Sequence, residues 1–277
     1  IKHGGFGDDC LGNYVYKADK WFNLAQTLDC GQAFRWKQCS DNTFEGIAGN
    51  KYLKVSQDKH EITFYNTTKE EFELVWKKYF DFDRDYNEIL SRARQDKLLL
   101  KITDFCGGIR VCNQDPWETL CSFIISQNNN IPRIKGIIER LCEKFGKPIY
   151  GGYSFPKAEK IAACSLDDLA DLRCGFRAKY ILDAAEKCTG QIDLEVLKKV
   201  DIDKAREMLM EIKGVGPKVA DCTLLFGLGF KNAFPVDVWI KRAMASLFKD
   251  GLPANLADCA GIIQQYIFYY ARTEKIF

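Results

Sequence analysis

The residue types best suited to chemistry in this chain gather between positions 214 and 237. Lys218 follows the segment Gly214-Val215-Gly216-Pro217, and Asp237 follows Pro235-Val236 after a short loop. A lysine amine attacks carbon only when unprotonated, so a nucleophilic lysine needs a site where burial or nearby positive charge lowers its pKa. Lys218 is expected at the start of a helix, with Cys222 one turn further on the same face. The spacing allows one site for these three side chains, although an ordinary lysine is more often solvated or bound to phosphate.

Composition excludes several other chemistries. The 277-residue chain has two histidines, twelve cysteines without a C-x-x-C pair, and a net charge of +2. Zinc-finger, His-rich metal and Ser-His-Asp chemistries therefore lack their residues. The cysteines are scattered singly through apolar segments, as buried thiols in a reducing compartment would be. There is no apolar stretch of about 18 residues that could span a membrane. The net charge neither supports nor excludes binding to DNA.

Two glycines precede Lys218 in what the periodicity indicates is a turn between two helices. Apolar residues at helical spacing predict a helix from about 204 to 212, and Pro217 suits the first turn of the next one. Gly214 and Gly216 permit a tight turn whose N–H groups, with that of Val215, could bind a DNA phosphate at a helix N-terminus. A plain turn between helices is the simpler interpretation of the glycines alone.

The remaining pattern predicts an antiparallel sheet followed by helices. Residues 34–65 alternate with period two and carry turn residues between the runs, which is typical of a meander. Asp115 is expected to cap a helix, with Glu118 completing a capping box, and an asparagine-rich turn at 127–130 separates it from a second helix ending at Gly146. Asp237 is expected to cap a helix too, which is worth about 1 kcal/mol without any catalytic role.

Several segments together resemble the 8-oxoguanine DNA glycosylases of the helix-hairpin-helix (HhH-GPD) superfamily. The resemblance rests on Gly-Val-Gly-Pro-Lys-Val-Ala-Asp-Cys at 214–222 and Pro-Val-Asp-Val at 235–238. Further similar segments are 30–36, 126–134 and 175–180, so the resemblance covers about residues 20–272. It implies a mixed, mainly α fold with an N-terminal antiparallel β-sheet domain and a helical HhH-GPD region. It also implies a DNA base-excision repair enzyme with glycosylase and lyase activities.

The resemblance implies a role for each matched residue. Lys218 is the nucleophile that forms a Schiff base with the sugar and permits β-elimination, and Asp237 stabilises positive charge as the flipped base departs. The carbonyl of Gly31 would accept the N7 hydrogen that distinguishes 8-oxoguanine from guanine. Phe268 and Cys222 would sandwich the base and Gln264 would contact its Watson–Crick edge, although core packing is the default for a lone phenylalanine.

Residues for the opposite strand are also implied. Asn128, Arg133 and Arg177 resemble residues that fill the vacated stack and bind the orphaned cytosine, whose O2 and N3 accept arginine donors. A solvated Arg133 is the competing interpretation. Phe176 stands where a tyrosine is frequent and should keep a stacking wedge without the hydroxyl. Trp239 stands where a histidine occurs, which removes any contact attributed to that histidine.

We expect three regions: an N-terminal extension over 1–14, truncated or partly introduced by cloning, a sheet domain over 15–100, and helical domains over 101–277 with the hairpin at about 204–227. The expected partner is double-stranded DNA containing 8-oxoguanine, preferably opposite cytosine, bound by a monomer. No cofactor is expected, and an iron–sulfur cluster is disfavoured because only Cys259 follows Cys222. Location would be cytoplasmic in a bacterium or archaeon and nuclear in a eukaryote.

Two other functions stay open at this stage. A monofunctional glycosylase for alkylated bases would share the fold and Asp237 but would not need an amine at Lys218. A noncatalytic DNA-binding module would use the hairpin only as a phosphate clamp. Covalent trapping on damaged DNA separates both from a bifunctional glycosylase.

Overall fold

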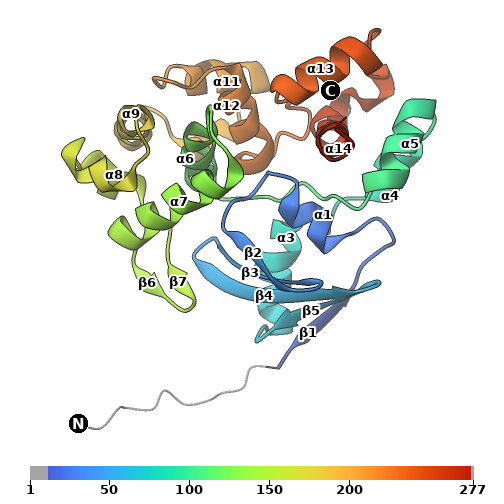
Figure 1. Ribbon diagram of the computed structural model, residues 1–277, viewed down its shortest axis with the longest axis horizontal. Helices are drawn as coiled ribbons and strands as arrows, with labels where there is room; N and C mark the ends of the chain where they lie inside the picture. The colour runs from blue at the N-terminus through green and yellow to red at the C-terminus, as the bar shows by residue number, and fades with distance from the viewer. Residues whose placement is uncertain (1–11, 276–277) are drawn as a thin grey trace.

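The structure is a computed structural model that describes residues 12–275 (Figure 1). Eleven residues of the expected N-terminal extension, 1–11, lie outside the described residues, whereas Tyr14 already belongs to the first strand. The chain forms an antiparallel sheet followed by a larger helical region, as the sequence predicts. None of the helices in the described part of the chain is long and apolar enough to cross a membrane.

The sheet has five strands in the order β1-β5-β4-β3-β2. Its strands are β1 (Tyr14–Lys17), β2 (Trp36–Ser40), β3 (Thr43–Ala48), β4 (Lys51–Asp58) and β5 (Glu61–Tyr65). Val55 in the central strand lies opposite Phe44 on one side and Phe64 on the other, and all three are buried. This alternation of buried and exposed residues produces the period-two pattern of the sequence. Strand β1 was not predicted, because its four residues, Tyr-Val-Tyr-Lys, are too few to establish a period-two pattern.

Helices begin earlier than the sequence suggests. Residues Lys69–Tyr79 form a continuous helical segment that comprises α2 (Lys69–Glu71), a π-helical turn (Phe72–Trp76) and α3 (Lys77–Tyr79). Its apolar side packs on the sheet, where the Phe72 ring centroid lies 4.9 Å from that of Phe64. The expectation of sheet structure up to about residue 100 is therefore wrong for its last third. The aromatic residues that cover the sheet come from a helix, which local alternation does not reveal.

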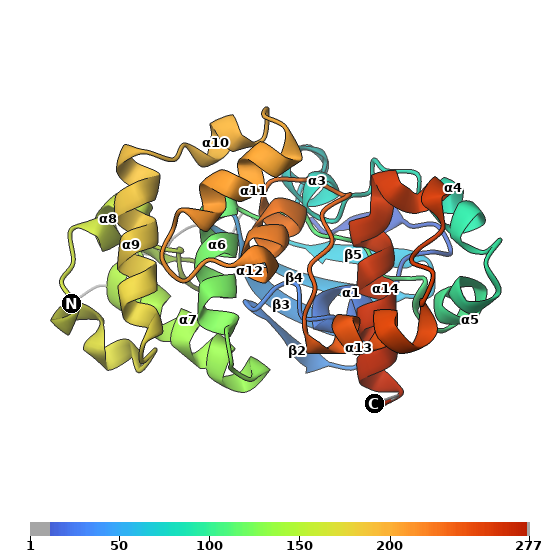
Figure 2. The same ribbon diagram turned by 90° about the horizontal axis from the view of Figure 1, so that it is seen from above.

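The helical region surrounds α6, a central buried helix. Its elements are α4 (Tyr86–Ala93), α5 (Lys97–Cys106), α6 (Pro116–Ser126), α7 (Ile131–Phe145), α8 (Ala158–Ala162), α9 (Arg177–Gly190), α10 (Leu194–Leu197), α11 (Ile202–Met210), α12 (Pro217–Cys222), a π-helical turn (Thr223–Gly227), α13 (Val238–Leu247), α14 (Ala260–Thr273) and the short strands β6 (Pro148–Ile149) and β7 (Gly152–Tyr153). Helix α1 (Leu24–Asp29) packs in the sheet core instead, through Leu24 and Leu28. Two short 3-10 turns cover Asp167–Leu172 and Ala254–Cys259. Seen from above, α12 lies between α6 and α14 (Figure 2).

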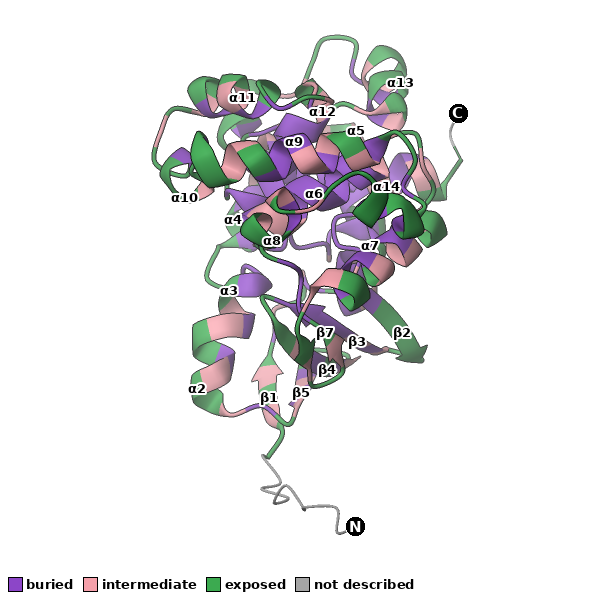
Figure 3. Ribbon diagram, turned by 90° about the vertical axis from the view of Figure 1, so that its left-hand side faces the viewer, coloured by how far each residue is buried: buried purple, intermediate pink, exposed green. Residues whose placement is uncertain are grey.

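Two hydrophobic cores hold these regions. One lies under the sheet, and the other joins the helices, as the buried faces of α6 and α9 show in Figure 3. The helical core includes Tyr86, Leu90 and Leu99, so α4 and α5 pack with the helices rather than with the sheet. All eleven cysteines in the described residues are free thiols, and eight of them are buried.

Local capping signals place the helices that carry the site. The carboxylate of Asp115 accepts a 2.8 Å hydrogen bond from the N–H of Glu118, and Asn130 caps α7 in the same way at 3.0 Å. The expected capping box is incomplete, because the Glu118 carboxylate pairs with Arg35 at 3.4 Å. Helix α11 begins two residues earlier than predicted, at Ile202.

Candidate active site

One small cavity is lined by residues from five separate segments of the chain. Six residues nominated from the sequence line it: Gly31, Lys218, Cys222, Asp237, Gln264 and Phe268. Its volume is about 50 Å³, which is room for one or two water molecules at about 30 Å³ each. Larger cavities of about 610 and 360 Å³ lie elsewhere and contain none of these six residues.

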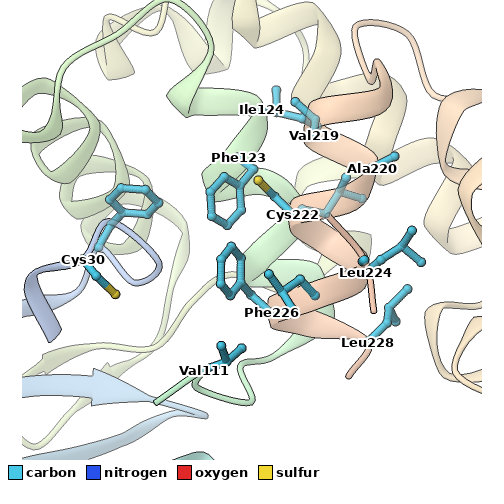
Figure 4. Close-up of a cluster of buried hydrophobic side chains, with 14 of the residues drawn as sticks. Cys30, Val111, Phe123, Ile124, Val219, Ala220, Cys222, Leu224, Phe226 and Leu228 are labelled. Atoms are coloured by element: carbon cyan, nitrogen blue, oxygen red, sulfur yellow. The ribbon is translucent and has the colours of Figure 1, made fainter. Parts of the chain in front are cut away.

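Lys218 projects into this cavity from the first turn of α12. Its Nζ lies 3.3 Å from the Ser126 hydroxyl and 4.9 Å from the ring centroid of Phe123. The Phe123 ring is itself stacked on Phe226, with centroids 5.3 Å apart and an interplanar angle of 16°. Figure 4 shows these two rings one above the other beside Cys222. The amine thus faces an aromatic wall, and its position half inside the protein differs from that of a surface lysine.

Asp237 caps α13, as predicted. Its carboxylate accepts a 2.8 Å hydrogen bond from the N–H of Ile240. Burial raises the pKa of Asp237, while the Ile240 N–H and the positive charge of Lys218 oppose that rise. The carboxylate and the amine therefore act on one another across the cavity, which is the arrangement needed to stabilise a developing positive charge.

Cys222 and Phe268 both contribute to the apolar lining of the cavity. Burial raises the pKa of Cys222 to about 11, although Lys218 partly opposes the shift. The thiol is therefore neutral near pH 7 and offers an apolar surface. Gly31 has a φ of +79°, and a Cβ there would lie 3.7 Å from the edge of the Phe268 ring. The backbone conformation favours glycine at this position, and Gly31 and Phe268 lie close together in the cavity wall.

The amide of Gln264 is already committed within the protein. Its Nε2 donates to the carbonyl of Pro235 at 2.9 Å, and its Oε1 accepts from Nε2 of Gln265 at 2.6 Å. Gln264 and Gln265 are both buried in α14. One donor hydrogen and one acceptor lone pair of Gln264 remain for a ligand.

The hairpin forms between α11 and α12, but only part of the phosphate prediction fits it. Gly214 has a φ of +80°, and a Cβ there would lie 2.3 Å from the ring of Tyr180 in α9. A Cβ at Gly216 would meet nothing within 4 Å, so that backbone is open to a ligand. The N–H of Val215 donates to the carbonyl of Ile212 at 3.0 Å. The Val215 donor is therefore used inside the hairpin in this conformation, and the phosphate contact expected there stays a prediction.

The residues nominated for the opposite strand form a second group, where α6, α7 and α9 end or begin. Asn128 has a left-handed φ of 46°, and Arg133 and Phe176 are exposed. Arg177 is buried instead, and its guanidinium donates to the carbonyls of Gln127 and Asn128. Burial, followed by the nearby charge of Arg133, lowers the pKa of Arg177. In this conformation Arg177 holds the asparagine turn from inside and is not presented to solvent.

Five further lining residues were not nominated from the sequence: Cys30, Phe123, Phe226, Pro235 and Gln265. Most of them belong to buried apolar stripes, and such residues signal only core packing until the tertiary structure is known. Trp239, which replaces a histidine, is half-buried and does not line the cavity. Within residues 12–275 there is no group of three or more His, Cys, Asp or Glu side chains that could hold a metal ion.

The sheet domain, the hairpin and the capped aspartate together define a helix-hairpin-helix DNA glycosylase. Residues 15–120 match the family model of the 8-oxoguanine DNA glycosylase N-terminal domain, and residues 121–251 match that of the HhH-GPD superfamily base excision DNA repair proteins. The chain belongs to the 8-oxoguanine DNA glycosylase family within that superfamily.

Relatives from three kinds of organism support this assignment. The chain is 33% identical to an N-glycosylase/DNA lyase of Saccharomyces cerevisiae over 79% of its own length and 66% of that protein, so it spans just under two thirds of that relative. It is 32% identical to a probable N-glycosylase/DNA lyase of Methanothermobacter thermautotrophicus, over 76% and 77% of the two chains. The 8-oxoguanine glycosylase/lyase of Clostridium acetobutylicum, in complex with double-stranded DNA containing cytosine opposite 8-oxoguanine, has a TM-score of 0.89 and 39% identity over 96% and 97%.

Proposed function

We propose that this protein removes 8-oxoguanine from double-stranded DNA, preferably opposite cytosine, and then nicks the strand by β-elimination. The observation that carries the proposal is the meeting of Lys218 and Asp237 in one cavity with Gly31, Cys222 and Phe268. The Clostridium relative is bound to DNA with this lesion pair, which supports the choice of substrate.

The reaction uses groups that line the cavity. The Lys218 amine attacks C1′ of the flipped nucleotide, the bond from C1′ to N9 breaks, and the base leaves with the bonding electrons and takes up a proton. Asp237 stabilises the positive charge that develops on the sugar. Ring opening gives a Schiff base between Lys218 and C1′. Loss of a proton from C2′ then expels the 3′ phosphate and cleaves the strand.

The location of Lys218 favours this enzyme over a noncatalytic phosphate clamp. A clamp lysine would stand on the outer surface of the hairpin, whereas Lys218 lies half-buried, 4.9 Å from the Phe123 ring centroid. A monofunctional alkyl-base glycosylase would use Asp237 to activate water and would not need the Lys218 amine. We propose that the reaction needs no metal or other cofactor, because the amine and the carboxylate suffice for each step.

Covalent trapping tests the proposal. The protein is incubated with an 8-oxoguanine:cytosine duplex and borohydride, which reduces the Schiff base to a stable amine link. A protein–DNA adduct together with release of 8-oxoguanine is the expected result. Base release without an adduct would establish a monofunctional glycosylase, and binding without either would leave only the clamp.

A further inference from the structure

Gln265 lines the cavity and carries a buried side-chain acceptor that has no hydrogen-bond partner among the described residues. The residue is only 4% exposed, and the acceptor in question is its Oε1. Burying an acceptor without a partner is unfavourable, and proteins rarely leave one. An acceptor that stays unpaired beside a binding cavity is explained most simply when a ligand supplies the missing donor.

The orientation of this amide is fixed by a neighbouring carbonyl. The Pro235 carbonyl can only accept, so the Gln264 side chain must turn its NH₂ group toward it, at 2.9 Å. Gln264 Oε1 then faces Gln265, which must present its own NH₂ group, at 2.6 Å. Gln265 Oε1 is consequently turned away from Gln264. Reversing either amide would bring two acceptors or two donors together.

We propose that Gln265 is a specificity-determining residue, whose Oε1 accepts a hydrogen bond from the donor edge of the six-membered ring of the flipped base. This inference rests on the proposed glycosylase function. Guanine-type bases carry two adjacent donors there, N1–H and the 2-amino group. Gln264 has one acceptor lone pair left, so the two glutamines together offer two acceptors. An adenine-type base has a ring acceptor at N1 and no 2-amino group, which leaves these oxygens without partners.

The two glutamines also connect the base to the catalytic aspartate. Pro235, at the far end of the amide pair, lies two residues before Asp237. A base that donates a hydrogen bond to Gln265 therefore stabilises the loop that carries the Asp237 carboxylate. Gln265 contacts the base itself in this proposal, and its effect on the loop passes through Gln264.

The test compares excision of 8-oxoguanine and 8-oxoadenine, each opposite cytosine, by wild type and Gln265→Met. Methionine preserves length and volume but removes the acceptor. The wild type is expected to favour 8-oxoguanine, and the variant to lose on the order of 10-fold or more of that ratio. The matched control is Gln57→Met, in a sheet-domain glutamine whose amide bonds the backbone of Phe22, Leu24 and Lys59. It should lower the melting temperature and leave the ratio unchanged.

The outcomes distinguish failure of the proposed role of Gln265 from failure of the proposed glycosylase function. A Gln265→Met protein that loses excision of both bases equally, with a fall in melting temperature, would show a structural glutamine and overturn the assignment while the function stands. An unchanged ratio at unchanged stability would overturn it as well. A wild-type protein that releases no 8-oxoguanine would remove the proposed function and, with it, the role of Gln265.

Discussion

The Nε of Arg177 donates a 2.9 Å hydrogen bond to the main-chain carbonyl of Gln127, and its Nη2 donates one of the same length to that of Asn128. One buried guanidinium thus fixes the turn that presents Asn128 and Arg133 to solvent. Replacing Arg177 with alanine leaves those carbonyls without donors in the interior. We expect a loss of about 3 kcal/mol in the free energy of unfolding, measured by urea denaturation.

Arg133 should behave differently from Arg177, because its side chain is exposed. The Arg133→Ala variant is expected to keep wild-type stability within about 0.5 kcal/mol and to lose about 10-fold of its preference for cytosine over adenine opposite the lesion. Excision rates on the two duplexes measure the ratio. A cytosine-to-adenine ratio equal to that of the wild type would refute the assignment of Arg133 to the opposite base.

The nucleophile is tested by Lys218→Gln. Excision and trapping should fall on the order of 1000-fold or more, while binding to damaged duplex persists because phosphate contacts supply most of the affinity. Single-turnover excision and a binding isotherm measure the two effects. Lys204→Gln is the control, since that lysine is exposed on α11 and pairs with Glu207 at 3.6 Å. Excision by Lys218→Gln at close to the wild-type rate would exclude this lysine as the nucleophile.

Asp237 should set an acid limit on the reaction. Burial raises its pKa above the ordinary 3.8, and only the ionised carboxylate stabilises positive charge on the sugar. Acidification therefore removes activity as Asp237 takes up a proton, with a midpoint above that ordinary value. Single-turnover rates between about pH 4 and pH 8 at saturating enzyme would show the decline. The Asp237→Asn variant should be slow throughout and lose the part of this acid limb that depends on the carboxylate. A midpoint at or below 3.8 in the wild type contradicts the prediction.

Glu118 makes stability fall as the pH rises. Burial raises its pKa to about 7, with Arg35 opposing the rise. Between pH 4.5, the pKa of this group in the unfolded chain, and about pH 7, the folded chain holds a proton that the unfolded chain has lost. The free energy of unfolding is therefore highest below pH 4.5 and falls as the pH rises to about 7. The change should be about 3 kcal/mol. Urea denaturation at several pH values measures it, and Glu118→Gln should flatten the profile. Equal slopes for both proteins would exclude Glu118 as the cause.

Substitution by alanine should affect stability at one hairpin glycine and DNA binding at the other. At Gly214 the φ of +80° and a Cβ 2.3 Å from the Tyr180 ring both oppose a side chain, so Gly214→Ala should cost more than about 1 kcal/mol of stability. At Gly216 nothing lies within 4 Å, so the alanine variant should fold normally and bind DNA more weakly. Melting curves and binding isotherms together distinguish these effects. A stable Gly214→Ala protein would show that the hairpin tolerates the contact by moving.

The sequence predicts those parts of the molecule that depend on neighbours in the chain. The caps at Asp115 and Asp237, the meander and the hairpin all follow from residue types within a few positions of each other. The roles of Lys218 and Asp237 came from family resemblance, whereas their meeting in one cavity is a tertiary fact. The burial of Arg177 against main-chain carbonyls has no sequence signal, because a carbonyl belongs to every residue. The unpaired oxygen of Gln265 likewise becomes visible only when its surroundings are folded around it.

Tyr180 touches two functional elements at once. One side of its ring packs on Gly214 of the hairpin, and its centroid lies 5.8 Å from that of Phe176, the exposed aromatic at the start of α9. Tyr180 therefore joins the turn that is expected to bind a phosphate to the aromatic side chain that is expected to contact a base step, and so helps to set the spacing between these two predicted contacts.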